Sequence, residues 1–171
     1  TDDTTVLRRL CRARKDLLKH RIAAANQLRA HLDGAMPGAV GLFCALDAPI
    51  SLAFLARFGT QDALDGLSEA RLAGWLRRQR YSGRTSAAVL LQRIHAAPRG
   101  PVGETAAGLE AITGALLAVL ASLVQQIGVL DKRIAAAFNA HPDAPIFAGL
   151  PKAGTLRAAR LLGEIGDARG R

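Results

Sequence analysis

Apolar residues recur every three to four positions over two long stretches of the chain, a spacing that predicts two long amphipathic helices. The first stretch covers residues 5–32, and the second covers residues 104–140, where Pro142 ends it. The first helix would be about 40 Å long, more than a compact domain of this size needs. We therefore expect the two helices to pair as a coiled coil, either within one chain or between two.

One apolar seam of the second stretch is a candidate for self-association. Its residues step by three and four, as a heptad requires: Leu109, Ile112, Leu116, Val119 and Leu123. This seam is longer than one small core can cover, so we predict a homo-oligomer, a dimer or larger. Residues 111–130 carry no charge, which also allows a membrane span. Two glutamines, weak hydrophobicity from alanine and the seam itself argue against the span, and we expect no membrane contact.

Short helices are predicted between the two long ones. Their expected ranges are 49–58, 61–66, 69–80 and about 86–97. The predicted N-caps are Thr4 or Thr5 for the first long helix and, for three of the short ones, Thr60, Ser68 and either Thr85 or Ser86. No alternating strand pattern of useful length occurs, so the predicted fold class is all-α.

Composition narrows the class of protein. Half of the 171 residues are hydrophobic, which excludes an intrinsically disordered chain. Only 4% are aromatic, so the apolar residues are mostly Ala, Leu, Val and Ile, and the bias toward Ala, Leu and Arg favours helix over sheet. The two cysteines exclude a disulfide scaffold and indicate a reducing compartment. Cys11 lies on the apolar face of the first helix and Cys44 follows Phe43, so we expect both thiols to be buried. The sequence does not begin with Met, and no apolar stretch follows its acidic start, so we expect no signal peptide and expect the chain to be a piece of a longer protein.

Positive charge points to a polyanionic partner. Lys and Arg number 23 against 14 acidic residues, for a net charge of +9, and residues 71–100 hold seven arginines and no acid. The predicted nucleic-acid contacts in that stretch are Arg77, Arg78, Arg80 and Arg84, with Tyr81 as a candidate to stack on an unpaired base. A stripe on the first helix is a third candidate surface, with a solvated face as its alternative: Arg8, Arg12, Lys15 and Lys19.

A Pro/Gly turn near the C-terminus predicts a second contact surface. Residues 146–154 lead directly into a helix, which would present the backbone N–H groups of Gly154 and Thr155 to a phosphate. Lys152, Arg157 and Arg160 could reach neighbouring phosphates. This pattern is typical of a helix-hairpin-helix, which clamps the DNA backbone without reading sequence. The alternative is an ordinary corner between two helices.

Nothing in the chain predicts a catalytic or metal site. The carboxylates are scattered, and no pair lies with a histidine at metal-ligand spacing. The histidines, which are His20, His31, His95 and His141, are isolated and expected at the surface or at helix ends. We therefore assign no catalytic residue, no metal ligand and no cofactor to this chain.

Several segments, in order, resemble the insertion-sequence transposases of the IS-one-ten type. The run LPKAGTLRAARLLGEIGD (150–167) is similar to the start of their C-terminal domain. ANQLRAHL (25–32) resembles the end of their first linker helix, residues 55–84 resemble their helical middle, and QIGVLDKRI (126–134) precedes the hairpin as it does in the family. Lys152 departs from the pattern, because the family often has Gly there.

The resemblance implies a domain organisation. These transposases have an acidic RuvC-like domain that holds divalent metal, a coiled-coil linker and a C-terminal domain with a catalytic serine. Residues 1–145 would be the helical linker and residues 146–171 the start of the C-terminal domain. The chain would then start after the acidic domain, stop short of the serine and be inactive alone. DNA, and in some members a structured guide RNA, are the implied partners, in the bacterial cytoplasm.

Three functional hypotheses follow. In the first, the chain is a transposase fragment that supplies oligomerisation and nucleic-acid contacts. In the second, it is a structural helical oligomerisation module whose basic surface is incidental. In the third, it is an RNA-binding helical adaptor unrelated to transposition. The salt dependence of DNA binding separates the transposase-fragment hypothesis from the structural-module hypothesis, because phosphate contacts make the affinity for DNA fall steeply as salt rises.

Overall fold

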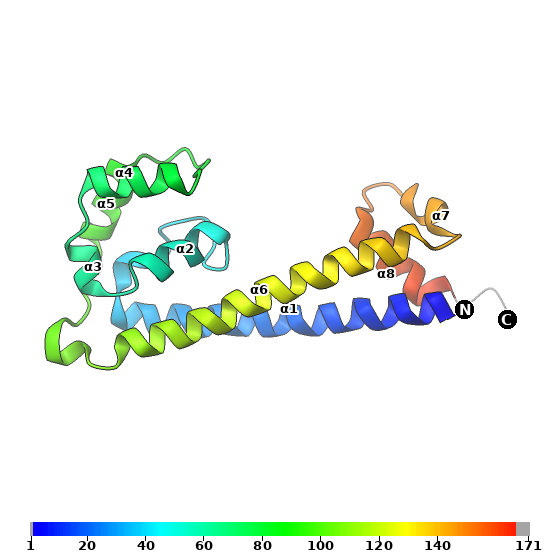
Figure 1. Cartoon of the computed structure of the whole chain (residues 1–171), viewed down its shortest axis with the longest axis horizontal. Coiled ribbons are helices and arrows are strands. Elements are labelled where there is room, and N and C mark those ends of the chain that lie inside the picture. The colour runs from blue at the N-terminus through cyan, green and yellow to red at the C-terminus, as the bar shows by residue number, and fades with distance from the viewer. Residues whose placement is uncertain (1, 167–171) are drawn as a thin grey trace. The chain divides into compact units, whose positions relative to one another are not determined.

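The computed structural model describes residues 2–166, and within them every regular element is a helix (Figure 1). The elements are α1 (Asp2–Ala35), η1 (Pro37–Ala39), α2 (Pro49–Arg57), α3 (Gln61–Asp65), α4 (Glu69–Arg78), α5 (Ala87–Ala96), η2 (Gly103–Ala106), α6 (Leu109–Asn139), α7 (Ala144–Ala148) and α8 (Thr155–Ile165). The all-α prediction is confirmed. Contacts divide the chain into unit 1, Thr1–Ile22 with Ser122–Arg171, and unit 2, Ala23–Ala121. The expected family boundary after residue 145 stays a prediction.

Local signals placed the short helices well. The side chains of Thr60, Ser68 and Ser86 accept hydrogen bonds from the backbone N–H three residues later, at 3.1, 3.3 and 3.3 Å. Each bond satisfies an N–H that has no partner inside its own helix. These three predicted N-caps are confirmed.

Both long helices begin elsewhere than predicted. α1 already includes Asp2, so Thr4 lies inside the helix, is buried and does not cap it. The second long helix begins at Leu109 and not at residue 104. Gly103 and Gly108 have φ values of 61° and 81°, in the left-handed region, and a right-handed helix cannot continue through them.

Unit 1 has a small apolar core. Its buried members are Leu7 and Cys11 of α1, Ile134 and Phe138 of α6, and Ala144, Ala158, Ala159 and Leu162 from the α7–α8 region. The alanines let α8 lie close to α1, and a Cβ on Gly163 would be only 3.2 Å from Cα of Arg8. Two polar contacts show that α1 and α6 run antiparallel here, Thr4 to His141 and Arg14 to Asp131.

The buried face of α6 differs from the predicted seam. Four of its buried residues are spaced by seven, namely Thr113, Leu120, Ile127 and Ile134, and Phe138 is buried beside them. His141 continues the seven-residue series beyond the helix. Apolar spacing does not reveal this register, because Thr113 and His141 are polar. Of the predicted seam, Ile112 and Val119 are 47% and 55% exposed, and the three leucines are half-buried. Within the chain, α6 therefore packs through a different face, and self-association through the seam stays a prediction.

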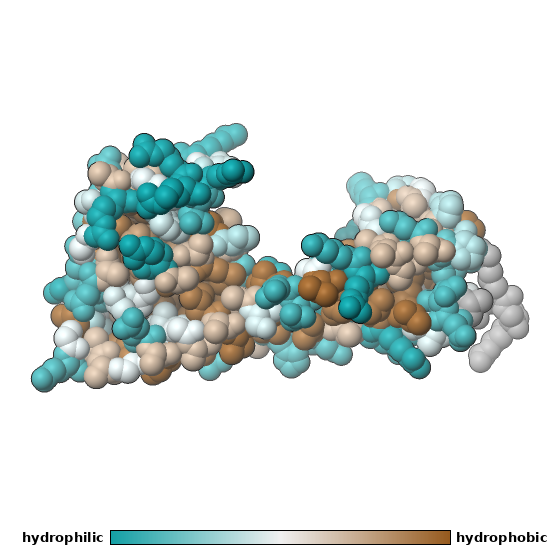
Figure 2. All heavy atoms as spheres, in the orientation of Figure 1, coloured by the Kyte–Doolittle hydropathy of each residue, from teal (hydrophilic) through white to brown (hydrophobic). Residues whose placement is uncertain are grey.

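Hydropathy alone would also allow α6 to cross a membrane. Over the part of the chain that the structure describes, one candidate span occurs, Gly103–Asn139, with a mean hydropathy of 2.0 in its most apolar window. Only 11% of that window is buried, and hydrophobic residues reach the surface along α6 (Figure 2). One such helix is weak evidence for a membrane span.

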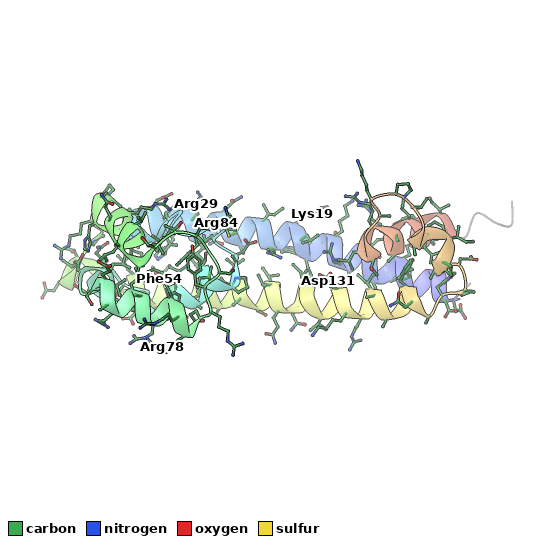
Figure 3. All side chains as sticks on the ribbon, turned by 90° about the horizontal axis from the view of Figure 1, so that it is seen from above. Lys19, Arg29, Phe54, Arg78, Arg84 and Asp131 are labelled. Atoms are coloured by element: carbon green, nitrogen blue, oxygen red, sulfur yellow. The ribbon has the colours of Figure 1, made fainter. Side chains whose placement is uncertain are left out.

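Unit 2 has an aromatic core. The rings of Phe54, Phe58 and Trp75 contact one another with centroids 5.1 to 5.7 Å apart. Phe54 is 1% exposed and lies among the helices (Figure 3). His31 near the end of α1 is hydrogen-bonded to the hydroxyl of Thr113 at 2.7 Å, which ties α1 to the start of α6.

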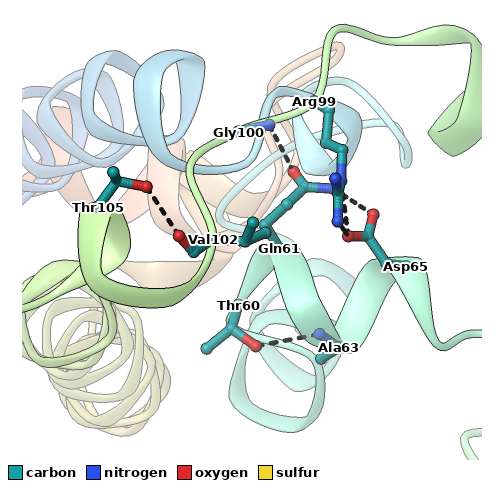
Figure 4. A network of polar contacts seen from close by, with 8 residues as sticks. All are labelled: Thr60, Gln61, Ala63, Asp65, Arg99, Gly100, Val102 and Thr105. Carbon is teal, nitrogen blue, oxygen red and sulfur yellow. Dashed lines mark hydrogen bonds and ion pairs between the residues drawn. The ribbon is translucent and has the colours of Figure 1, made fainter.

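A polar network fastens the segment after α5 to α3 (Figure 4). The amide oxygen of Gln61 accepts the N–H of Gly100, and its amide nitrogen donates to Asp65, both at 2.9 Å. Arg99 Nε donates to the same carboxylate at 2.8 Å, which lowers the pKa of Asp65. Arg71 donates to the carbonyl of Gly66. Two arginines of the basic stretch therefore hold the fold together.

Candidate nucleic-acid interface

The arginine cluster, defined here as Arg77, Arg78, Arg80 and Arg84, lies at and after the C-terminal end of α4. The helix ends in a Schellman-type turn, in which the N–H of Arg80 donates to the carbonyl of Arg77 and the N–H of Tyr81 donates to that of Leu76, both at 3.0 Å. Arg80 takes the left-handed position of this turn with φ 52°, where glycine is usual.

All four guanidinium groups of the cluster are available to a ligand. Each arginine is exposed, and none forms an ion pair or a side-chain hydrogen bond with any residue from 2 to 166. Hydrophilic residues gather over α4 and the loop after it (Figure 2), and Arg78 and Arg84 lie at the surface of unit 2 (Figure 3). Arg77 and Arg78 also complement the negative end of the helix dipole, which is the structural alternative for these two.

Tyr81 is more enclosed than its sequence position indicates. Its ring is half-buried and packs edge-on against Phe43, with centroids 5.6 Å apart. Gly83 allows this arrangement, because a Cβ there would lie 2.0 Å from the ring. A base could stack only on the part of the ring that Phe43 leaves open.

The second predicted surface is an ordered turn between α7 and α8. The N–H of Ala153 donates to the carbonyl of Leu150, and the Arg157 guanidinium donates to the carbonyl of Lys152 at 3.2 Å. The carbonyl of Gly154 accepts the first bonds of α8, whereas the N–H groups of residues 154–156 have no acceptor among the described residues. A Cβ on Gly154 would meet nothing within 4 Å, so the approach to these N–H groups is open.

Lys152 holds an unusual backbone conformation in this turn. Its φ is 59°, in the left-handed region that glycine adopts without cost. The transposase family that the sequence resembles often has glycine at this position. The chain thus has a lysine where the backbone conformation favours glycine. Lys152 and Arg157 are exposed, and so is Arg160, which lines a pocket with Arg12 and Lys15 of α1.

The basic stripe of α1 is largely occupied within unit 1. Arg8 Nε donates to the carbonyl of Gly163 at 2.8 Å, and Arg12 makes two hydrogen bonds to Glu164 at 3.0 and 3.1 Å. The Arg12 contact holds the pKa of Glu164 below its usual range. Arg8 and Arg12 therefore fasten α8 to α1, a role that neither alternative for the stripe anticipated. Lys15 and Lys19 are exposed.

One cysteine differs from expectation. Cys44 is exposed, whereas Cys11 is buried as predicted and burial raises the pKa of its thiol. His141 lies just after the end of α6, one of the two places expected for the histidines, and it is buried there. It is 6% exposed, contacts Thr4 through Nε2 at 3.1 Å and accepts the N–H of Asp143 through Nδ1 at 3.1 Å. Among the described residues, no cluster of three His, Cys, Asp or Glu side chains could hold a metal ion.

Comparison with known proteins found similarity to a transposase. No protein-family model and no solved structure matches the chain. A curated protein does, the "Mini-circle putative transposase for IS117" of Streptomyces coelicolor, which is 32% identical over 174 residues. The similarity supports a transposase family. It covers 95% of this chain and 41% of the Streptomyces protein, so the chain spans about two fifths of that relative's length. The narrower IS-one-ten type stays a prediction.

Proposed function

We propose that this chain is a segment of an insertion-sequence transposase that binds nucleic-acid backbone and contributes to oligomerisation. DNA is the proposed partner, in the bacterial cytoplasm, and a structured guide RNA is a second. The segment is proposed to be inactive alone, with divalent metal held by an acidic domain elsewhere in the whole protein.

One observation carries the nucleic-acid part of the proposal. Among residues 2–166, the non-glycine residues with positive φ are Arg80 and Lys152, and each belongs to one of the two basic surfaces. Left-handed backbone costs a residue with a Cβ on the order of 1–2 kcal/mol, so a cation kept at both positions indicates a use for its charge. Each surface also has groups that suit phosphate, namely unpaired guanidinium groups in one and free N–H groups at a helix N-terminus in the other.

The outward face of α6 supports the oligomerisation part. Ile112 and Val119 project half-exposed from a helix that buries a different face within the chain. Covering them with a second copy would remove apolar surface from water. This face also favours the structural-module hypothesis, so the binding experiment decides between the two.

The test of the first surface is salt-dependent binding to a DNA duplex. The variant Arg77→Ala, Arg78→Ala, Arg80→Ala and Arg84→Ala should bind all sequences more weakly, and the salt slope should fall by about 1 for each phosphate that is no longer bound. A matched control removes four exposed cations elsewhere: Arg9→Ala, Arg29→Ala, Lys132→Ala and Arg133→Ala. If both variants lose affinity equally, net charge alone accounts for binding and the structural-module hypothesis replaces this proposal.

The second surface is tested with Lys152→Ala combined with Arg157→Ala, and separately with Gly154→Ala. The glycine variant adds a methyl group where nothing lies within 4 Å, so the fold should tolerate it while the approach of a phosphate is hindered. Unchanged duplex affinity and salt slope in both variants would remove the turn from the interface.

Self-association is tested by sedimentation equilibrium. Ile112→Glu with Val119→Glu places two charges on the outward face and should give a monomer at tens of micromolar protein. Ala118→Glu with Gln125→Glu adds the same charge at exposed positions on another face of the same helix and should leave the oligomer intact. A monomeric parent chain would contradict the proposal.

A further inference from the structure

A pocket of about 390 Å³ opens beside the arginine cluster, on unit 2. Its walls come from the loop before α2, from the start of α2 and from the turn after α4, and they include Phe43, Cys44, Ile50, Arg80 and Tyr81. The volume is in the range of small-molecule sites, about 300–1,000 Å³. Sequence patterns do not predict this pocket, because Phe43 and Tyr81 are far apart along the chain.

The aromatic wall of the pocket is held in place before any ligand arrives. Phe43 packs edge-on against both Phe54 and Tyr81, with centroids 5.6 Å apart in each pair. Phe54 is itself fixed in the core, and the backbone of Tyr81 is bonded to Leu76 in the turn that ends α4. Little side-chain freedom remains to be lost when a flat group enters, which favours binding.

Charge identifies the occupant. Among the described residues that form the pocket wall, Arg80 alone carries a charge, the next cation along the chain is Arg84, and residues 71–100 contain no carboxylate. An apolar protein side chain would gain from the rings and nothing from the cations. A nucleotide satisfies both, because its base stacks on aromatic rings and its phosphates meet arginine. Bases inside a duplex are stacked on one another and cannot enter such a pocket.

We propose that the pocket between Phe43 and Tyr81 takes one unpaired nucleobase, whose flanking phosphates lie against Arg80 and Arg84. The inference rests on the proposed nucleic-acid binding and adds a preference for single-stranded or looped segments. The unpaired base can come from an RNA loop or from single-stranded DNA. The pocket requires only an unstacked base with flanking phosphates, which both provide.

Cys44 provides a direct measurement on the unaltered chain. Its thiol is exposed and lines the pocket, whereas Cys11 is buried with a raised pKa, so a thiol reagent should modify Cys44 selectively. We expect saturating amounts of an RNA hairpin with an unpaired loop to slow the modification at least about tenfold. A blunt duplex, bound equally well through its phosphates, should leave the rate unchanged. A single DNA strand with the loop sequence shows whether the pocket distinguishes RNA from DNA. If the RNA hairpin alone protects Cys44 from modification, the pocket is assigned to RNA. If both nucleic acids protect Cys44, the pocket recognises the unpaired base that they share.

Tyr81→Ala and Tyr81→Phe provide the second measurement. Tyr81→Ala should weaken binding of the looped RNA about 5- to 150-fold, the range for loss of one stacked base, with duplex affinity unchanged. Tyr81→Phe keeps the ring and should restore the affinity. The pocket assignment would be overturned if Cys44 were modified equally fast with the RNA hairpin and with the duplex. It would also be overturned if the parent chain and both Tyr81 variants bound the looped RNA equally well. Neither result would contradict the proposed binding of duplex DNA. Failure of every nucleic acid to bind at low salt would overturn the proposed function as well.

Discussion

The arginines at the start of α1 in unit 1 and the arginine cluster of unit 2 differ in their partners. In unit 1, Arg8, Arg12 and Arg14 all bond to residues of the C-terminal half of the chain and hold helices together around a small core rich in alanine. In unit 2, an aromatic core provides the packing, and the arginine cluster after α4 has no partner among the described residues. Unit 2 has bonded arginines as well, Arg71 and Arg99, but its arginine cluster stays exposed beside a substantial aromatic core.

The largest expected effect tests whether aromatic packing holds unit 2. Phe54→Ala removes the ring that contacts Phe43, Phe58 and Trp75, and it should lower the free energy of unfolding by about 3–5 kcal/mol. The single tryptophan, Trp75, reports the transition by fluorescence during urea unfolding. Ile22→Ala, at a residue that is 63% exposed, is the control and should cost less than about 0.5 kcal/mol. A cost below about 1 kcal/mol for Phe54→Ala would break the contrast between the two cores.

The next effect compares one arginine from each unit. Arg8→Ala leaves the buried carbonyl of Gly163 without its donor and should cost about 1–3 kcal/mol, measured by urea unfolding followed by circular dichroism. Arg78→Ala removes an exposed side chain that has no partner among the described residues and should change stability by less than about 0.5 kcal/mol. Hydrogen exchange in α8 should accelerate in the first variant only. Equal costs would mean that the two sets of arginines do not differ.

Sequence predicts the helices of this fold and not the roles of its arginines, for a physical reason. Caps and glycine breaks act within four residues, so Thr60, Ser68 and Ser86 could be identified by inspection. The bonds of Arg8 and Arg12 reach partners 155 and 152 residues away, which spacing along a helix cannot indicate. Charge density in 71–100 did locate the exposed cluster, although Arg71 and Arg99 in the same stretch proved structural.

The face that α6 buries within the chain could not be recognised in the sequence for a related reason. The face that α6 turns toward α1 includes the polar residues Thr113 and Asp131, which bond to His31 and Arg14 of α1. A single polar position in a coiled coil fixes alignment at some cost in stability, and it also interrupts the apolar spacing by which a seam is recognised. The apolar seam that is visible in the sequence, from Leu109 to Leu123, is the outward face proposed for self-association.

A smaller effect compares the two left-handed cations. Arg80→Gly and Lys152→Gly relieve backbone strain, and after the entropy cost of glycine each should stabilise the chain by about 0.5–1 kcal/mol in thermal unfolding. Arg77→Gly, inside α4, is the control and should destabilise by about 1 kcal/mol. If the cations are kept for binding, both stabilised variants should bind duplex DNA more weakly. A stabilised variant with undiminished affinity would remove that residue from the interface.

The smallest effect concerns the titration of Glu164. Its hydrogen bonds from Arg12, with Arg8 and Arg160 nearby, lower the pKa of this carboxyl. Because the pKa of Glu164 is lower in the folded state, its ionised form stabilises unit 1 at pH values above the ordinary pKa of a glutamate, about 4.3. This stabilisation is lost as the pH falls through the pKa of the folded state. Arg12→Ala should therefore raise the pKa of Glu164 toward its ordinary value and reduce the loss of stability between neutral and acid pH. An NMR titration of the Glu164 side chain measures the shift, with Arg9→Ala as the exposed control on the same helix. If Arg12→Ala leaves the pKa of Glu164 where it was, the Arg12 contact is incidental, and Arg8 alone fastens α8 to α1.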